Sequence, residues 1–144
     1  MKFHFFRRPT TLPNGFDLGD VRVEGEGGVA TSAGHVPDQG MMIYVALTDL
    51  LDGLQGLLAK SRREFEFIGT DSSFRLVFRH GKGDRLNVKY RGGTIEEAPA
   101  TEIASAALAS AGEFLSNHPL PESDPVAGDI SAAISELRAF LNDR

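Results

Sequence analysis

The feature that most constrains the fold is the alternation of apolar and polar residues through three successive segments between residues 65 and 90. A period of two places one set of side chains on each face of a β-strand. Glycine-containing breaks at residues 69–73 and 81–84 separate the segments, as turns do between antiparallel neighbours. We therefore predict an antiparallel meander with one wet face. Its apolar face carries Phe65, Phe67, Phe74, Leu76, Phe78, Leu86, Val88 and Tyr90.

Shorter strands are predicted on either side of the meander. Lys2–Phe6 alternates in the same way, and Asp20–Ala33 forms a strand that is interrupted near Gly27 by a bulge or bend. Residues Thr94–Glu97 follow a glycine turn and add an edge strand. Met41–Ala46 is apolar and fits either a buried strand or the start of a helix, and we favour the strand.

Three segments have the apolar spacing of amphipathic helices. The first begins at Thr48, which we predict as its N-cap, and carries a stripe of leucines to Leu58. The second follows Pro99, a proline suited to a first helical turn, and stops at Asn117. The third opens with Asp124 as N-cap and a proline behind it. We expect these helices to cover the apolar face of the sheet.

The predicted fold is therefore α+β, with an antiparallel sheet of four to six strands and one face covered by three helices. The 144 residues are enough for one core, so we expect a single domain over residues 1–144. The absence of cysteine excludes disulfides, thiolate metal sites and a cysteine nucleophile. No apolar run reaches the roughly 18 residues of a membrane helix, and the start is not of signal-peptide type, so we expect a cytoplasmic protein without membrane contact.

Charge is unevenly distributed along the chain. Residues 1–40 carry a net charge of −1, residues 41–92 carry +3 and residues 93–144 carry −7. The basic middle and the acidic tail should attract each other if they pack together, and the acidic total disfavours nucleic acid as a partner. Arginine outnumbers lysine by eleven to four, a bias that is typical of GC-rich bacterial genomes.

Residues that could carry catalysis are scattered. No serine lies in a Gly-x-Ser-x-Gly elbow, and the histidines stand apart from one another in the sequence. Asp49 and Asp52 fit a hard cation or a solvated helix face, and the second interpretation is favoured. We therefore expect no metal, no cofactor and, on balance, no enzyme. The alternative is a small-molecule-binding or hydrolytic domain with a pocket that uses His80, Asp71 or His35.

The polar face of the meander is the most informative surface, because it gathers cations. The candidates for a partner surface are Arg75, Arg79, Arg85, Lys89 and Arg91. Glu64 and Glu66 on the preceding strand share this face and could pair with Arg75 and Arg79. An ordinary solvated face, a surface for a protein partner and a surface for nucleic acid all stay open, in that order of preference.

Two phrases, Asp71-Ser72-Ser73-Phe74-Arg75-Leu76 and His118-Pro119-Leu120-Pro121, stand out but form no motif with an assignable function. In outline the chain resembles the small bacterial immunity proteins, which are short, acidic, cysteine-free and α+β, without a catalytic motif. The resemblance implies a non-catalytic protein-binding domain that neutralises a partner. Self-association through an exposed edge of the meander also stays open.

Overall fold

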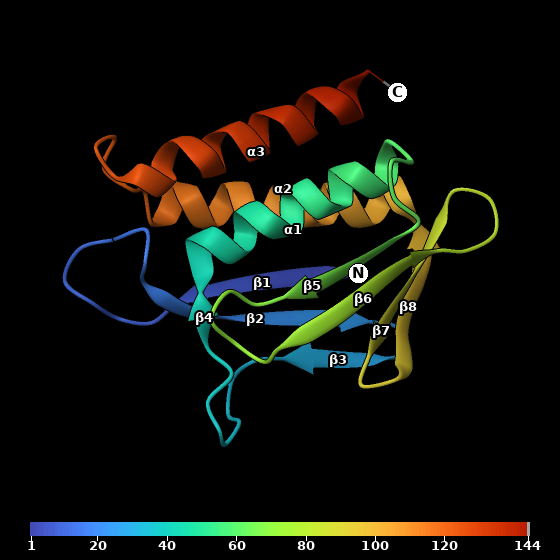
Figure 1. Ribbon diagram of the computed structural model, residues 1–144, viewed down its shortest axis with the longest axis horizontal. Coiled ribbons are helices and arrows are strands. Elements are labelled where there is room, and N and C mark those ends of the chain that lie inside the picture. Colours follow the sequence, from blue (N-terminus) through green and yellow to red (C-terminus); the bar gives the residue numbers. More distant parts are fainter. Residues whose placement is uncertain (144) are drawn as a thin grey trace.

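The computed structural model describes residues 1–143, and its strands lie in two antiparallel sheets (Figure 1). The first sheet has the order β1-β2-β3, with β4 pairing beside the start of β2. Its strands are β1 (Lys2–Arg7), β2 (Leu18–Gly25), β3 (Gly28–Thr31) and β4 (Met41–Met42). The second sheet is the predicted meander, in sequence order. Its strands are β5 (Glu64–Ile68), β6 (Arg75–His80), β7 (Arg85–Tyr90) and β8 (Gly93–Pro99).

The helices form two layers on these sheets. They are α1 (Ile43–Leu58), α2 (Ala100–Asn117) and α3 (Pro125–Asn142). α1 contacts β1 and β2 of the first sheet and β5 of the second, so it spans both sheets. α2 contacts β1, β7 and β8, and α3 packs on α1 and α2 as an outer layer (Figure 1).

The predicted α+β class is confirmed, and the structure adds that the strands divide into two sheets instead of one. α1 separates the two groups of strands in the sequence, so each group pairs within itself. The sheets meet where the turn between β2 and β3 docks on β8, and there the Gly27 amide donates to the Ile95 carbonyl at 2.9 Å. A side chain at Gly25 has no room, because its Cβ would lie 1.9 Å from the Ile95 carbonyl oxygen.

One core joins both sheets and the helices. The predicted apolar face of the meander is buried from Phe65 through Val88, and Tyr90 packs partly buried at its margin. Val21 and Val23 face this core from the first sheet, and α1 contributes its leucine stripe. The period-two pattern therefore identified the inward positions correctly.

The start of α1 differs from the prediction. Only Met41–Met42 is strand, and the helix begins at Ile43, so the strand interpretation of Met41–Ala46 is wrong for its larger part. The Met42 amide donates to the Thr70 carbonyl and the Ile43 amide to the Asp17 carbonyl, and α1 has no side-chain cap. Thr48 is consequently not the N-cap but an interior residue, whose hydroxyl donates to the Tyr44 carbonyl at 3.0 Å.

The remaining boundaries were predicted more closely. Asp20–Ala33 is a hairpin of β2 and β3 instead of one bent strand, because the chain reverses at Gly25–Gly28. Pro99 occupies the N-cap position of α2, one residue before the first turn. Asp124 caps α3 as predicted, with its side chain accepting from the Val126 amide at 2.9 Å.

Candidate functional site

The cations predicted on the outer face of the meander are exposed, but carboxylates on neighbouring strands balance two of them. Arg75 lies 2.8 Å from Glu66, and Arg79 lies 2.6 Å from Glu64, so both predicted cross-strand pairs are present. All four side chains are well exposed, and such pairs contribute about 0–1 kcal/mol each to stability. This part of the face is an alternating pattern of charges instead of a cationic patch.

The other three cations of that face have different surroundings. Arg85 donates to the Glu97 carbonyl at 2.9 Å, with its Nε 4.0 Å from the Glu97 carboxylate. The Arg91 guanidinium lies over the Tyr90 ring and 3.4 Å from Nδ1 of His35. Lys89 is exposed and makes no ion pair within residues 1–143. These positions are accessible to a partner, and the five cations of the face exceed its carboxylates, Glu64, Glu66 and Glu97, by two.

His80, Asp71 and His35, the residues of the alternative pocket, lie in different places. His80 ends β6, and its Nε2 donates to the Leu57 carbonyl at 2.8 Å. Asp71 lies beyond the opposite end of β6, in a turn with a left-handed backbone (φ 61°). His35 bonds the Thr31 carbonyl through Nε2 at 2.7 Å and faces Arg91. His80 and Asp71 are therefore not a nucleophile–base or acid–base pair.

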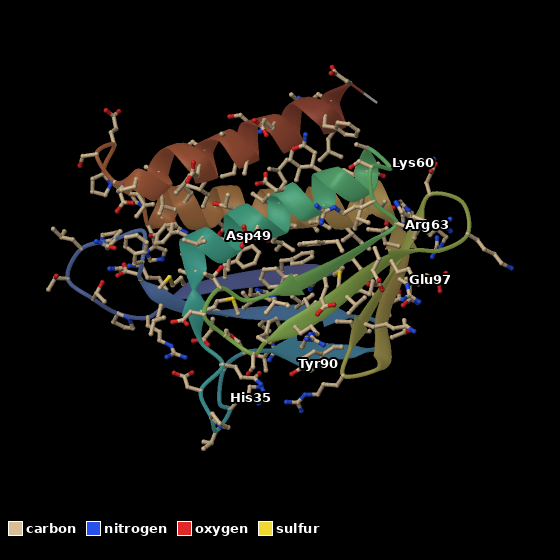
Figure 2. The ribbon with its side chains drawn as sticks, viewed as in Figure 1. His35, Asp49, Lys60, Arg63, Tyr90 and Glu97 are labelled. Carbon is tan, nitrogen blue, oxygen red and sulfur yellow. The ribbon has the colours of Figure 1, made fainter. Side chains whose placement is uncertain are left out.

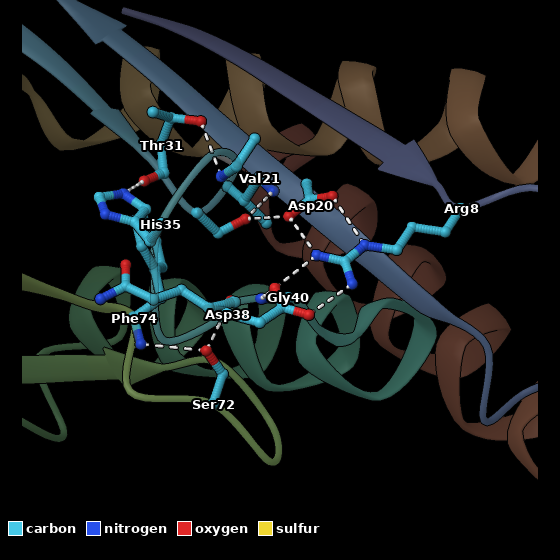
Figure 3. A network of polar contacts seen from close by, with 12 residues as sticks. Arg8, Asp20, Val21, Thr31, His35, Asp38, Gly40, Ser72 and Phe74 are labelled. Atoms are coloured by element: carbon cyan, nitrogen blue, oxygen red, sulfur yellow. Dashed lines mark hydrogen bonds and ion pairs between the residues drawn. The ribbon is translucent and has the colours of Figure 1, made fainter.

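A polar network explains the turn that contains Asp71 and the loop that contains His35 (Figure 3). Arg8 forms ion pairs with Asp20 of β2 and with Asp38 of the loop, and its hydrogen bonds hold the pKa of Asp38 well below the usual range. The Ser72 hydroxyl donates to the Gln39 carbonyl at 2.6 Å and accepts from the Phe74 amide. These contacts tie the loop to both sheets, so the conspicuous Asp71-Ser72-Ser73 phrase has a structural role.

The groove between α1 and β5 is the site that combines an open surface with distinctive chemistry. Its volume is about 300 Å³. The residues that line it are Asp49, Asp52 and Gly53 of α1, Arg62, and Phe65, Glu66, Phe67 and Ile68 of β5. Gly53 lets the two elements approach closely, because a Cβ there would lie 2.2 Å from the Phe65 ring.

The floor of this groove is β5, one of the two edge strands of the second sheet. The His80 amide donates to the Arg63 carbonyl, and the Gly69 amide donates to the Phe74 carbonyl. Because hydrogen-bonded pairs alternate along an antiparallel ladder, the odd-numbered residues of β5 form the backbone bonds to β6. The amides and carbonyls of Glu64, Glu66 and Ile68 consequently point away from β6, toward the groove. An unpaired strand edge of this kind is able to accept a further strand.

The wall of the groove carries carboxylates that the rest of the protein does not neutralise. Partial desolvation raises the pKa of Asp49, and this effect exceeds the opposite effect of a 3.5 Å hydrogen bond from Thr70, which lowers the pKa. Desolvation also raises the pKa of Asp52, and the charges of Glu136, Asp49 and Asp129 raise it further. Within the described chain, Asp52, Asp129 and Glu136 make no ion pair.

Among residues 1–143, the acidic tail meets the basic middle in one ion pair, where the Glu97 carboxylate of β8 lies 4.0 Å from Arg85 of β7. No ion pair among residues 1–143 joins α2 or α3 to residues 41–92, because these helices pack through their apolar stripes. The packing of α3 on α1 instead brings Asp129 and Glu136 close enough to Asp52 for their charges to raise its pKa. The pairing of Asp49 with Asp52 is evident from their spacing in the sequence, but the contribution of α3 depends on tertiary packing.

A second groove of about 160 Å³ lies between α2 and β1, an edge strand of the first sheet. The Arg8 amide donates to the Leu18 carbonyl, so the even-numbered residues of β1 form the backbone bonds to β2. The backbone groups of Phe3, Phe5 and Arg7 therefore point away from β2, toward the open edge. Glu113 of α2 is its one carboxylate. The groove at β5 is larger and more acidic.

Neither groove holds a metal-binding group: residues 1–143 contain no cluster of three or more histidine, aspartate or glutamate side chains suited to an ion. In the same part of the chain no helix is long and apolar enough to cross a membrane. Comparison of the sequence and structure with protein families, curated proteins and solved structures finds no match.

Proposed function

We propose that the protein is a non-catalytic polypeptide-binding domain, which takes an extended basic segment of a partner protein as an additional strand on β5. The observation that carries the proposal is the unpaired edge of β5 lying beside the carboxylates of α1. Backbone amides and carbonyls in one row recognise a polypeptide backbone, because only an extended chain presents complementary groups at the same spacing. The neutralisation of a basic partner, as in immunity proteins, is one biological use of such a site.

The carboxylates on the groove wall support a basic partner. Their raised pKa values mean that Asp49 and Asp52 are less stable as anions in the folded protein than in water, so they do not stabilise the fold at neutral pH. A lysine or arginine of the partner would supply the missing counter-charge. Complementary charge of this kind also raises the rate of association and makes binding sensitive to salt.

The edge is tested by Glu66→Pro, with Glu66→Ala as the matched control. The Glu66 amide faces the groove and makes no bond to β6, so proline removes a donor of the free edge while the pairing within the sheet remains. Both variants lose the Glu66–Arg75 ion pair. Binding is measured by the fluorescence anisotropy of a labelled peptide of alternating lysine and valine.

We expect the alanine variant to bind this peptide nearly as well as the unmodified protein, and the proline variant to lose binding while its circular dichroism spectrum stays native. Equal binding by the two variants would contradict strand addition at β5. If the proline variant is misfolded, Ile68→Pro with Ile68→Ala repeats the comparison at the next groove-facing amide.

The acidic wall is tested by the double substitution Asp49→Asn and Asp52→Asn. We expect the affinity for the same peptide to fall about tenfold in low salt, since two exposed charge pairs together contribute on the order of 1–2 kcal/mol. Glu102→Gln with Glu122→Gln is the control, because it removes the same charge from exposed positions outside the groove. An equal loss in the control would indicate that only the net charge matters.

A further inference from the structure

A further cavity, of about 220 Å³, lies at the end of α1 that is remote from Asp49 (Figure 2). It is an open cavity that is bordered by the turn that follows α1, by the end of β6 and by the hairpin between β6 and β7. Its lining residues are Lys60, Arg62, Arg63, His80 and Gly83. The lining thus contains three permanent cations and one histidine, and no carboxylate.

The backbone beneath these side chains is held in place by hydrogen bonds. Lys60 has a left-handed conformation (φ 58°), with its amide donating to the Leu57 carbonyl at 3.1 Å. The His80 amide donates to the Arg63 carbonyl at 3.0 Å, and its ring donates to the same Leu57 carbonyl. Because the ring uses Nε2 for that bond, Nδ1 is the remaining polar atom of the imidazole. The cations therefore project from a fixed framework.

The positive charge of the cavity is only partly balanced. Lys60 lies 3.4 Å from Asp84, in a pair whose side chains are 69% and 73% exposed, so the contact is weak. The Arg62 guanidinium stacks over the Phe65 ring at 5.5 Å, which orients it without neutralising it. Neither Arg62 nor Arg63 makes an ion pair with any residue between 1 and 143. Like charges gathered in one concave site repel one another until an anion is bound.

We propose that this cavity is a binding site for a small oxyanion that carries two negative charges, with phosphate as the representative ligand. Arginine presents planar N–H groups that match the oxygens of phosphate or carboxylate, and lysine adds a point charge. The turn at Gly83, with φ 62°, leaves space at the cavity mouth because it carries no side chain. The site requires no polypeptide partner, so it stands or falls separately from the proposed function.

The test is a titration of the isotopically labelled protein with sodium phosphate, followed by NMR of the backbone amides. Sodium chloride of matched ionic strength corrects for screening, and sodium malonate asks whether a dicarboxylate occupies the same site. Arg63→Gln is the test variant, and Arg138→Gln is the matched control, because Arg138 is an exposed arginine of α3 outside this cavity.

We expect phosphate to produce saturable shifts at residues 60–63 and 80–84, with an affinity about tenfold lower in Arg63→Gln, as for loss of one charged hydrogen bond. Arg138→Gln should bind as the unmodified protein does. Shifts with malonate at the same amides would extend the ligand class to carboxylates, and their absence would confine it to phosphate. The proposal is overturned if the phosphate shifts are absent, do not saturate, or weaken equally in both variants.

Discussion

Replacement of Gly53 by alanine should destabilise the protein, although the same change in an ordinary helix stabilises it. Glycine in a helix interior costs about 1 kcal/mol relative to alanine. At Gly53, however, the new Cβ would lie 2.2–2.4 Å from three atoms of the Phe65 ring. That ring is stacked on Phe78, at a centroid distance of 5.9 Å, and is covered by Arg62, so a shift of the ring would disturb both contacts.

The magnitude follows from these opposing contributions. Overpacking costs typically about 1–3 kcal/mol, which exceeds the helical gain and leaves a net loss of about 0–2 kcal/mol. Gly112→Ala in α2 and Gly128→Ala in α3 are matched controls, since nothing lies within 4 Å of either new Cβ. Each control should gain up to about 1 kcal/mol. Urea unfolding followed by circular dichroism measures all three variants, and Gly53→Ala as stable as the controls would refute close packing of α1 on β5.

Three further perturbations test other contacts. Asp52→Asn should stabilise the protein by about 0.5 kcal/mol at neutral pH, because the raised pKa of Asp52 means that the native fold disfavours its anion. The gain should vanish below about pH 4, where the carboxyl group is protonated in both the folded and the unfolded state. Thermal melts across this pH range are the measurement. Tyr44→Phe should cost about 1 kcal/mol of stability, because it leaves the His118 carbonyl without its donor at 2.6 Å. Burial raises the pKa of Tyr44 to about 12, and an absorbance titration of the Tyr90→Phe variant, in which Tyr44 is the one remaining tyrosine, should detect this value. Gly25→Ala should cost about 1–3 kcal/mol and expose the Gly27 amide to hydrogen exchange, because its Cβ collides with the Ile95 carbonyl where the sheets meet.

Local patterns predicted the elements more reliably than their assembly. The alternation in residues 65–90 identified which residues are buried, and the Asp124–Pro125 pair marked the start of α3. The start of α1 was misplaced because the capping signal at Thr48 is local. The amides of Met42 and Ile43 are in fact satisfied by carbonyls of Thr70 and Asp17, which are distant in the sequence.

The candidate site was predictable only in part. Cross-strand pairing of Glu64 and Glu66 with arginines followed from the pleat, since opposite positions of antiparallel strands face the same side. The neighbourhood of Asp52 was not accessible in this way, because Glu136 reaches it through the packing of α3 on α1. The first strand of a meander is a candidate edge from its sequence position alone, but only the structure shows that β5 stays unpaired beside α1.

The most direct test of strand addition at β5 is hydrogen exchange of individual backbone amides, with and without the bound lysine–valine peptide. Glu64, Glu66 and Ile68 should gain protection on binding, because their amides are the unpaired donors of the edge. Phe65 and Phe67 already donate to β6 and should change little. Unchanged exchange at Glu64, Glu66 and Ile68, or protection that appears instead at Phe3 and Phe5 of β1, would contradict the account.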